Sequence, residues 1–361
     1  MIDKNSLPTC LMTIHQKHRA KLTSFFGYTL PLWYTSIKEE HHAVRTQAGI
    51  FDISHMGMLI LSGEGAFRFL EHMSCNTLGK VKKGLFVYTM LLNHEGGIRD
   101  DIMVGPMGSD YLVIVNASNA SKIRDWLSSH KPQGVHITPY NDTHGFIAIQ
   151  GPKAAQIVSQ IVNSDLATMR PFELRPIPYA TSTLWISRTG YTGEDGFEIM
   201  VPHALAETLF EAATNAGAKP CGLGARDSLR IEAGLPLYGQ ELGETLSPLV
   251  TRYADWVIQR NHPFLGKNAL EADADLMTTV GIEMQGNAIP RTGYPIVEGG
   301  HITSGTLSPT LGKPIGMALV PKTMSAPGTT LHVTIRNTPE KAVVVPLPFV
   351  RRTPPYPVTG R

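Results

Sequence analysis

The stretch Asn93–Val104, NHEGGIRDDIMV, is the part of the chain from which the fold can be read most directly. It follows an apolar and β-branched run, Phe86–Leu92, which predicts a buried strand. Gly96 and Gly97 then supply the backbone freedom that a tight reversal needs. Ile102–Val104 predicts a second strand, so the whole stretch predicts a β-hairpin.

Two adjacent carboxylates, Asp100 and Asp101, stand where this second strand begins. Neighbouring residues on a strand point to opposite faces, so if one aspartate faces solvent the other faces inward. An inward carboxylate is costly unless it has a partner, a ligand or a proton. The residues alone leave two interpretations open, a polar hairpin end or a functional carboxylate.

Composition describes a soluble globular protein of 361 residues with 42% hydrophobic and 17% charged residues. Its net charge of +2 gives no indication of nucleic-acid or membrane-surface binding. The three cysteines, Cys10, Cys75 and Cys221, are far apart, which favours a reducing compartment over a disulfide framework. With no apolar run of about 20 residues and no signal-peptide pattern at the N-terminus, we expect a cytoplasmic protein without a membrane span.

The order of elements predicts an α+β fold with antiparallel sheets, because several connections between the expected strands are short. Length suggests roughly two to three domains. A helix is expected over roughly His203 to Asn215, ended by Gly217. From Thr278 onward short β-type runs alternate with Gly- and Pro-rich turns, which predicts a separate all-β domain, a barrel or sandwich.

Three local expectations concern single segments. His15 and His18 are spaced to share one helix face, and we expect that face to be solvated. The run Phe25–Tyr34 reads as an aromatic loop that could wall a pocket or cover a core. Asn116 or Ser118 can cap the helix that follows.

The chain has no nucleophile elbow, no metalloprotease helix, no Walker loop and no complete dinucleotide-binding fingerprint. Its histidines form no metal-site pattern, so no metal is expected. What remains is a set of loops with single polar groups among aromatic residues, a mixture that suits a flat, heteroaromatic, partly anionic ligand. Each member also has an ordinary structural explanation; the set is Tyr88, Asp101, Asn116, Tyr191, Glu198 and Arg226.

Several long motifs together resemble one family, the aminomethyltransferase (T-protein) of the glycine cleavage system. They run in family order through about residues 8 to 352. The motifs are AVRTQAGIFDISHM (43–56), NHEGGIRDDI (93–102), RTGYTGEDGFE (188–198), CGLGARDSLRIEAG (221–234) and ITSGTLSPTLG (302–312).

The resemblance implies a three-domain cloverleaf around a central folate channel, made of two α+β domains and a C-terminal all-β barrel. The first domain would combine residues 1–54 with about 145–245, and the second about 55–144 with about 246–277. Residues 278–361 would form the barrel.

The resemblance also implies the reaction. The aminomethyl group carried by the lipoyl arm of the H-protein would pass its methylene carbon to tetrahydrofolate, releasing ammonia and leaving dihydrolipoyl-H-protein. By position in the motif, Asp101 rather than Asp100 would be the catalytic carboxylate. Tyr88, Asn116, Tyr191, Glu198 and Arg226 would bind the folate.

Two departures from the family pattern are the Phe26-Gly27-Tyr28 run, where relatives show Gly-Trp, and the tail at Pro354–Tyr356, which does not align. The main alternative is a non-transferase folate-binding relative that assists iron–sulfur cluster assembly. Those relatives have a cysteine where this chain has Arg188–Asp195. A folate-dependent demethylase would need a further flavin domain, and a pure interaction protein would not need these motifs.

Overall fold

The structure, a computed structural model, describes residues 3, 5–259, 261–271 and 276–352. The chain forms two compact units. The first contains residues 1–67, 79–87 and 103–227, and the second contains residues 68–78, 88–102 and 228–361. This division follows compactness, so the three-domain boundaries expected from the sequence stay a prediction.

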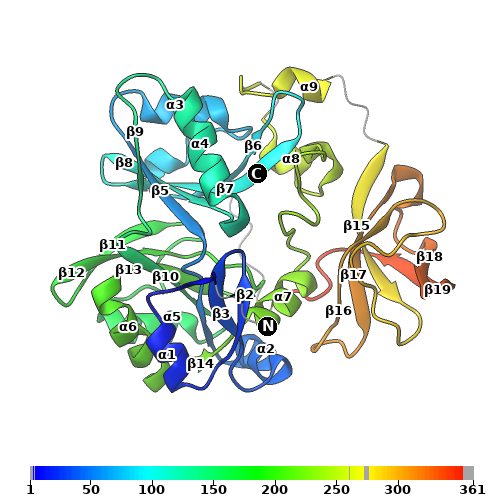
Figure 1. Cartoon of the computed structure of the whole chain (residues 1–361), viewed down its shortest axis with the longest axis horizontal. Helices are drawn as coiled ribbons and strands as arrows, with labels where there is room; N and C mark the ends of the chain where they lie inside the picture. Colours follow the sequence, from blue (N-terminus) through cyan, green and yellow to red (C-terminus); the bar gives the residue numbers. More distant parts are fainter. Residues whose placement is uncertain (1–2, 4, 260, 272–275, 353–361) are drawn as a thin grey trace. The chain divides into compact units, whose positions relative to one another are not determined.

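The largest sheet of the first unit has six strands in the order β11-β12-β13-β10-β4-β14. All pairings are antiparallel except β14 with β4. Two amphipathic helices, α5 and α6, pack on it (Figure 1) and bury Phe197 and Phe210 between the layers. The bounds are β4 Gly49–Asp52, β10 His144–Gln150, β11 Leu174–Tyr179, β12 Ser182–Ser187, β13 Gly196–Pro202, β14 Lys219–Pro220, α5 Ala154–Val162 and α6 His203–Asn215.

A second, three-stranded sheet lies at the N-terminus of the first unit, in the order β1-β3-β2. The expectation of a loop over residues 25–34 is wrong, because β2 (Lys21–Phe25) and β3 (Tyr28–Trp33) form an antiparallel hairpin. Phe26 and Gly27 both have positive φ, 45° and 81°, as a two-residue hairpin turn requires. β1 is Leu7–Pro8.

His15 is not on a solvated face. Helix α1 (Met12–Lys17) buries it completely, and its Nε2 lies 2.8 Å from Asp52 Oδ2. Tyr34 Oη lies 2.9 Å from His15 Nδ1, and Thr9 donates its hydroxyl to Asp52 at 2.6 Å. Burial alone would raise the pKa of Asp52, but the hydrogen bond and charge of His15 hold it below its usual value.

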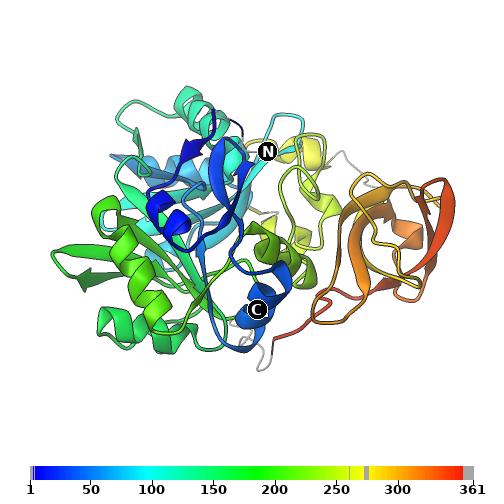
Figure 2. The ribbon, with the colours of Figure 1, turned by 60° about the horizontal axis from the view of Figure 1, so that its bottom comes forward.

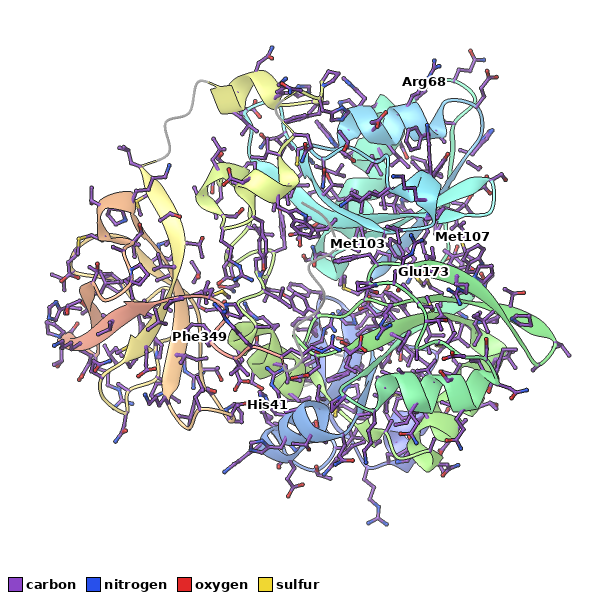
Figure 3. The ribbon with its side chains drawn as sticks, turned by 180° about the vertical axis from the view of Figure 1, so that it is seen from behind. His41, Arg68, Met103, Met107, Glu173 and Phe349 are labelled. Carbon is purple, nitrogen blue, oxygen red and sulfur yellow. The ribbon has the colours of Figure 1, made fainter. Side chains whose placement is uncertain are left out.

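The third sheet has the order β6-β7-β8-β5-β9, and its long strand β7 contributes to both units. In the first unit, Met103 and Met107, labelled in Figure 3, bound the half of β7 that pairs with β8. Neither Asn116 nor Ser118 caps a helix through its side chain: a 3-10 turn over Ala117–Asn119 comes first, and α4 begins at Ala120. The bounds are β5 Gly57–Ser62, β6 Val87–Leu92, β7 Ile98–Met107, β8 Asp110–Val115, β9 His136–Pro139 and α4 Ala120–His130.

The second unit contains the hairpin of β6 with the first half of β7. This hairpin packs into a core with residues from the later part of the chain, among them Leu242, Val257 and Phe264. Short helices connect these segments: α8 Ala254–Val257 and α9 Lys267–Glu271, with a 3-10 turn at Pro248–Val250. Three further helices of the chain are α2 Ile37–Thr46, α3 Ala66–Met73 and α7 Leu223–Glu232.

The all-β domain predicted from Thr278 onward is confirmed (Figure 2). Five antiparallel strands have the order β16-β17-β15-β19-β18 around an apolar core that includes Ile282, Val333 and Val344. Among the described residues these ladders do not close into a barrel; isolated bridges at Pro295 and Ile296 link the two edge strands instead. The bounds are β15 Met277–Met284, β16 His301–Leu307, β17 Pro314–Pro321, β18 Thr330–Ile335 and β19 Thr338–Val345.

No helix in the described part of the chain is long and apolar enough to cross a membrane.

Candidate active site

The hairpin predicted from Asn93–Val104 is present, and its turn is tightly fixed. Asn93 Oδ1 accepts hydrogen bonds from the backbone N–H of Glu95 and of Gly97, at 3.1 and 2.7 Å. Gly96 has φ +83°, and a Cβ on Gly97 would collide with the carbonyl oxygen of Glu244. Both glycines are therefore required, one by its conformation and one by close approach.

Both aspartates lie inside the strand, because β7 begins at Ile98 and not at Ile102. Asp100 is fully buried, whereas Asp101 is half-buried on the opposite face. Of the two aspartates that the sequence left undecided, Asp100 is therefore the inward carboxylate and does not form a polar hairpin end. A group that acts on a substrate must be reachable, so the half-buried position of Asp101 suits a catalytic role better.

Asp101 belongs to a group of side chains in the second unit that we call the carboxylate–aromatic group: Tyr88, Asp101, Tyr253 and Trp256. Tyr88 donates its hydroxyl to Asp101 Oδ2 at 3.0 Å. The ring of Trp256 stacks on that of Tyr88, with centroids 5.7 Å apart and an interplanar angle of 11°. Sequence reasoning missed two of these residues: Tyr253, which immediately precedes the short helix α8, and Trp256 within it.

Tyr253 is also electrostatically coupled to this group. Burial raises its pKa, and the charge of Asp101 raises it further, while Arg252 opposes both effects. Arg252 donates to the Tyr253 hydroxyl at 2.6 Å, and its guanidinium carbon lies 4.7 Å from the ring centroid. The phenol therefore stays protonated beside the carboxylate.

Three other predicted residues, Tyr191, Glu198 and Arg226, meet in the first unit. Together with Thr189 they form what we call the glutamate–arginine group. The guanidinium of Arg226 lies over the ring of Tyr191, 4.9 Å from its centroid. Thr189 donates its hydroxyl to Glu198 Oε2 at 2.6 Å. Glu198 lies on β13, and Arg226 lies in the first turn of α7.

Charges in this group are held in low-dielectric surroundings. Burial raises the pKa of Glu198, although the Thr189 hydrogen bond and the Arg226 charge oppose the shift. Burial likewise lowers the pKa of Arg226, and the charge of Glu198 opposes that shift. Nearby His55, 4% exposed, has its pKa lowered to about 4 by burial and by Arg226, so it is neutral at physiological pH.

Asn116 follows β8 in the first unit and is half-buried. The structure thus brings together Tyr88 with Asp101, and Tyr191 with Glu198 and Arg226. Thr189 and His55 were missed by sequence reasoning, although both stand within motifs that it singled out. Among the described residues no group of three or more His, Cys, Asp or Glu side chains could hold a metal ion.

Each of these groups contains side chains of a kind that suits a flat heteroaromatic molecule. A buried carboxylate accepts hydrogen bonds from ring N–H donors, a guanidinium donates to carbonyl or carboxylate oxygens, and aromatic rings supply stacking surface. A reachable carboxylate bonded to a phenol can stabilise positive charge that develops on a substrate.

The fold places the chain in a class of mixed α+β proteins with antiparallel sheets and a C-terminal all-β domain. Residues 11–261 match the family model of the GCVT N-terminal domain, and residues 278–351 match the glycine cleavage T-protein C-terminal barrel domain. The chain therefore belongs to the glycine cleavage T-protein (aminomethyltransferase) family.

Known aminomethyltransferases are similar to this chain over nearly its full length. The aminomethyltransferase of Geobacillus thermodenitrificans is 42% identical over 358 residues, which cover 95% of this chain and 98% of the relative. That of a strain of Thermus thermophilus is 43% identical over 348 residues, with the same two shares. The crystal structure of glycine cleavage system aminomethyltransferase T from Bartonella henselae superposes with a TM-score of 0.88 at 30% identity, covering 95% of this chain and 98% of that one.

Proposed function

We propose that this protein is the aminomethyltransferase of a glycine cleavage system. Its substrates are tetrahydrofolate and the aminomethyl group on the lipoyl arm of an H-protein. Its products are 5,10-methylenetetrahydrofolate, ammonia and dihydrolipoyl-H-protein. The observation that supports this most strongly is the half-buried Asp101, which accepts a hydrogen bond from Tyr88 in a chain of this family.

In this proposal the glutamate–arginine group binds the folate. Thr189 occupies one oxygen of Glu198, and the other oxygen accepts hydrogen bonds from N–H groups of the pterin ring. The charge of Arg226 opposes the rise that burial causes in the pKa of Glu198, and its guanidinium donates to folate oxygens. Tyr191, Tyr88 and Asn116 complete the set of folate contacts.

Asp101 is the catalytic residue. The reaction breaks the C–N and C–S bonds of the aminomethyl carbon and forms its bonds to the two folate nitrogens N5 and N10. The two protons of those nitrogens balance the ammonia and the thiol that leave. The carboxylate orients the attacking N–H and stabilises the positive charge that develops on the carbon as the amine departs. Tyr88 fixes its orientation.

This role does not require a covalent enzyme intermediate, in keeping with the absence of the usual nucleophile motifs in the sequence. Holding two large substrates in register supplies much of the rate enhancement. We also propose a cytoplasmic location, which the three scattered cysteines support.

Replacing Asp101 by Asn tests the catalytic assignment. We expect Asp101→Asn to bind tetrahydrofolate with an affinity close to the wild type and to lose at least about a hundredfold in turnover, because the amide keeps the shape but not the charge. The measurements are a calorimetric folate titration and a reconstituted assay with aminomethylated H-protein. Asp125→Asn, whose side chain is 71% exposed, is the control.

Turnover by Asp101→Asn within a few-fold of the wild type would remove Asp101 from the mechanism. Folate binding without ammonia release by the wild-type protein would favour the folate-binding, non-transferase alternative that acts in iron–sulfur cluster assembly.

A further inference from the structure

One buried amide touches both sides of the turn that carries Tyr191. Gln150, the last residue of β10, is fully buried. Its Nε2 donates to the backbone carbonyl of Thr189 at 3.0 Å, and its Oε1 accepts the hydroxyl of Thr192 at 2.9 Å. These two anchors enclose Tyr191 in the sequence, so the amide fixes the segment from which that ring projects.

The same amide is connected to Glu198 through Thr189. The hydroxyl of Thr189 donates to Glu198 Oε2 at 2.6 Å, while its carbonyl is held by Gln150. In the antiparallel pairing of β10 with β13, Gln150 stands opposite Gly196 and Ala148 opposite Glu198. Because residues two apart on a strand share a face, the side chains of Gln150 and Glu198 lie on the same side of the sheet.

Two glycines of the 188–198 motif make room for this side chain. A Cβ on Gly190 would collide with Gln150 Oε1, and a Cβ on Gly196 would collide with Gln150 Nε2. Neither position has a positive φ, so close approach and not backbone conformation requires glycine at both. The loop is therefore built around the amide of Gln150.

Two arginines hold further parts of the same loop. Arg45, on the helix that carries the labelled His41 in Figure 3, donates to the carbonyl of Thr192 at 2.8 Å and to Glu194 at 2.9 Å. Arg188 forms a two-pronged pair with Asp195 at 3.0 and 2.6 Å. These ion pairs fix the ends of the loop, and Gln150 fixes its centre.

We propose that Gln150 is a positioning residue that sets folate affinity by holding Tyr191 and the Thr189–Glu198 hydrogen bond in place. This inference rests on the proposed function, in which both residues bind folate. Only a side chain that donates and accepts at once satisfies both anchors, which is the property of an amide. A carboxylate at this position would face the Thr189 carbonyl without a proton to donate.

The test replaces Gln150 by Glu, which keeps the shape and removes the donor, and by Met, which removes both polar atoms. We expect the KM for tetrahydrofolate to rise by about tenfold in each variant, since one buried hydrogen bond is lost at a binding loop. The kcat at saturating folate and the KM for aminomethylated H-protein should stay within about twofold of the wild type.

Ser159→Ala is the matched control in the same unit. Its hydroxyl accepts from the backbone N–H of Leu166 at 3.0 Å and so holds a loop that contains no proposed site residue. If the Gln150 variants do not fold, Thr192→Val removes the hydroxyl that donates to Gln150 and that also accepts the backbone N–H of Glu194, and the same rise in KM is expected. A fall in kcat with an unchanged folate KM would show a purely structural role and overturn the proposal.

Glu198→Gln, measured in the same experiment, tests the proposed folate site separately from the positioning role of Gln150. If Glu198→Gln keeps the wild-type folate KM, the proposed folate site is wrong. If Glu198→Gln raises it and the Gln150 and Thr192 variants do not, the folate site stands and the positioning role of Gln150 is wrong.

Discussion

The structure allows the effect of Glu198→Gln on folate affinity to be estimated in more detail than that of any other substitution proposed above. It keeps the size of the side chain and the acceptor for Thr189, and it removes the negative charge that burial already disfavours. A hydrogen bond to a charged group contributes about 1.5 to 3 kcal/mol. At about 1.4 kcal/mol for each factor of ten, folate affinity should fall by roughly 10- to 150-fold.

The pH dependence of binding gives this prediction a second, independent readout. Because the pKa of Glu198 is raised, the wild-type carboxylate takes up a proton at a higher pH than an exposed glutamate does. Folate affinity of the wild type should therefore weaken as the pH falls toward that raised pKa. In Glu198→Gln this dependence should be absent, because the amide does not titrate.

Calorimetric titration with a stable reduced folate, from about pH 8 down to about pH 5, measures both effects. Thermal unfolding in the same buffers shows whether the variant is folded. An affinity equal to that of the wild type, or a pH dependence that survives the substitution, would refute the assignment of Glu198 to the folate site.

Two further predictions concern stability. Asp52→Asn should lower the free energy of unfolding by about 3 kcal/mol at neutral pH, because it breaks a buried pair with His15. Since the pKa of Asp52 is lowered in the folded protein, the stability that this carboxylate contributes is present above the ordinary aspartate pKa and is lost as the pH falls. The variant should therefore show a flatter acid-unfolding curve. An acid-unfolding curve unchanged in slope would contradict this. Gly97→Ala should lower the free energy of unfolding by about 3 kcal/mol, because its Cβ would collide with a backbone oxygen. The control Gly243→Ala, whose Cβ would have no atom within 4 Å, should lower it much less. Equal melting temperatures for the two variants would show that the hairpin turn can move to accommodate the added methyl group.

The elements that sequence predicted best are those whose signal is local. Helix α6 has the predicted bounds, because an amphipathic run is followed by Gly217 with φ +102°. The central hairpin and the C-terminal all-β domain were also predicted from local patterns, turn glycines and short β-branched runs. Local physics is enough for such elements.

The sequence-based predictions were wrong where the structure depends on a residue far along the chain, or on which face of a strand lies against the core. Alternation along a strand says that Asp100 and Asp101 face opposite sides, but the pattern does not say which side is the core; packing around β7 does. His15 is buried because Asp52, far along the chain, accepts its hydrogen bond. Tyr253 and Trp256 join Tyr88 only through the tertiary fold.

Choosing between the two aspartates shows what each kind of reasoning contributes. Physical reasoning identified a carboxylate that needs a partner, and the structure shows that the inward one is Asp100. The family resemblance selected Asp101, and its half-buried position beside Tyr88 supports that choice. The proposed catalytic group is thus the reachable member of the pair.

The most direct test of the proposed reaction follows both products of the wild-type enzyme together. Aminomethylated H-protein and tetrahydrofolate are mixed with the protein, and ammonia and 5,10-methylenetetrahydrofolate are measured over the same time course. We predict that the two products form in equal amounts and that omitting tetrahydrofolate suppresses the release of ammonia. Binding of folate without formation of either product would contradict the account.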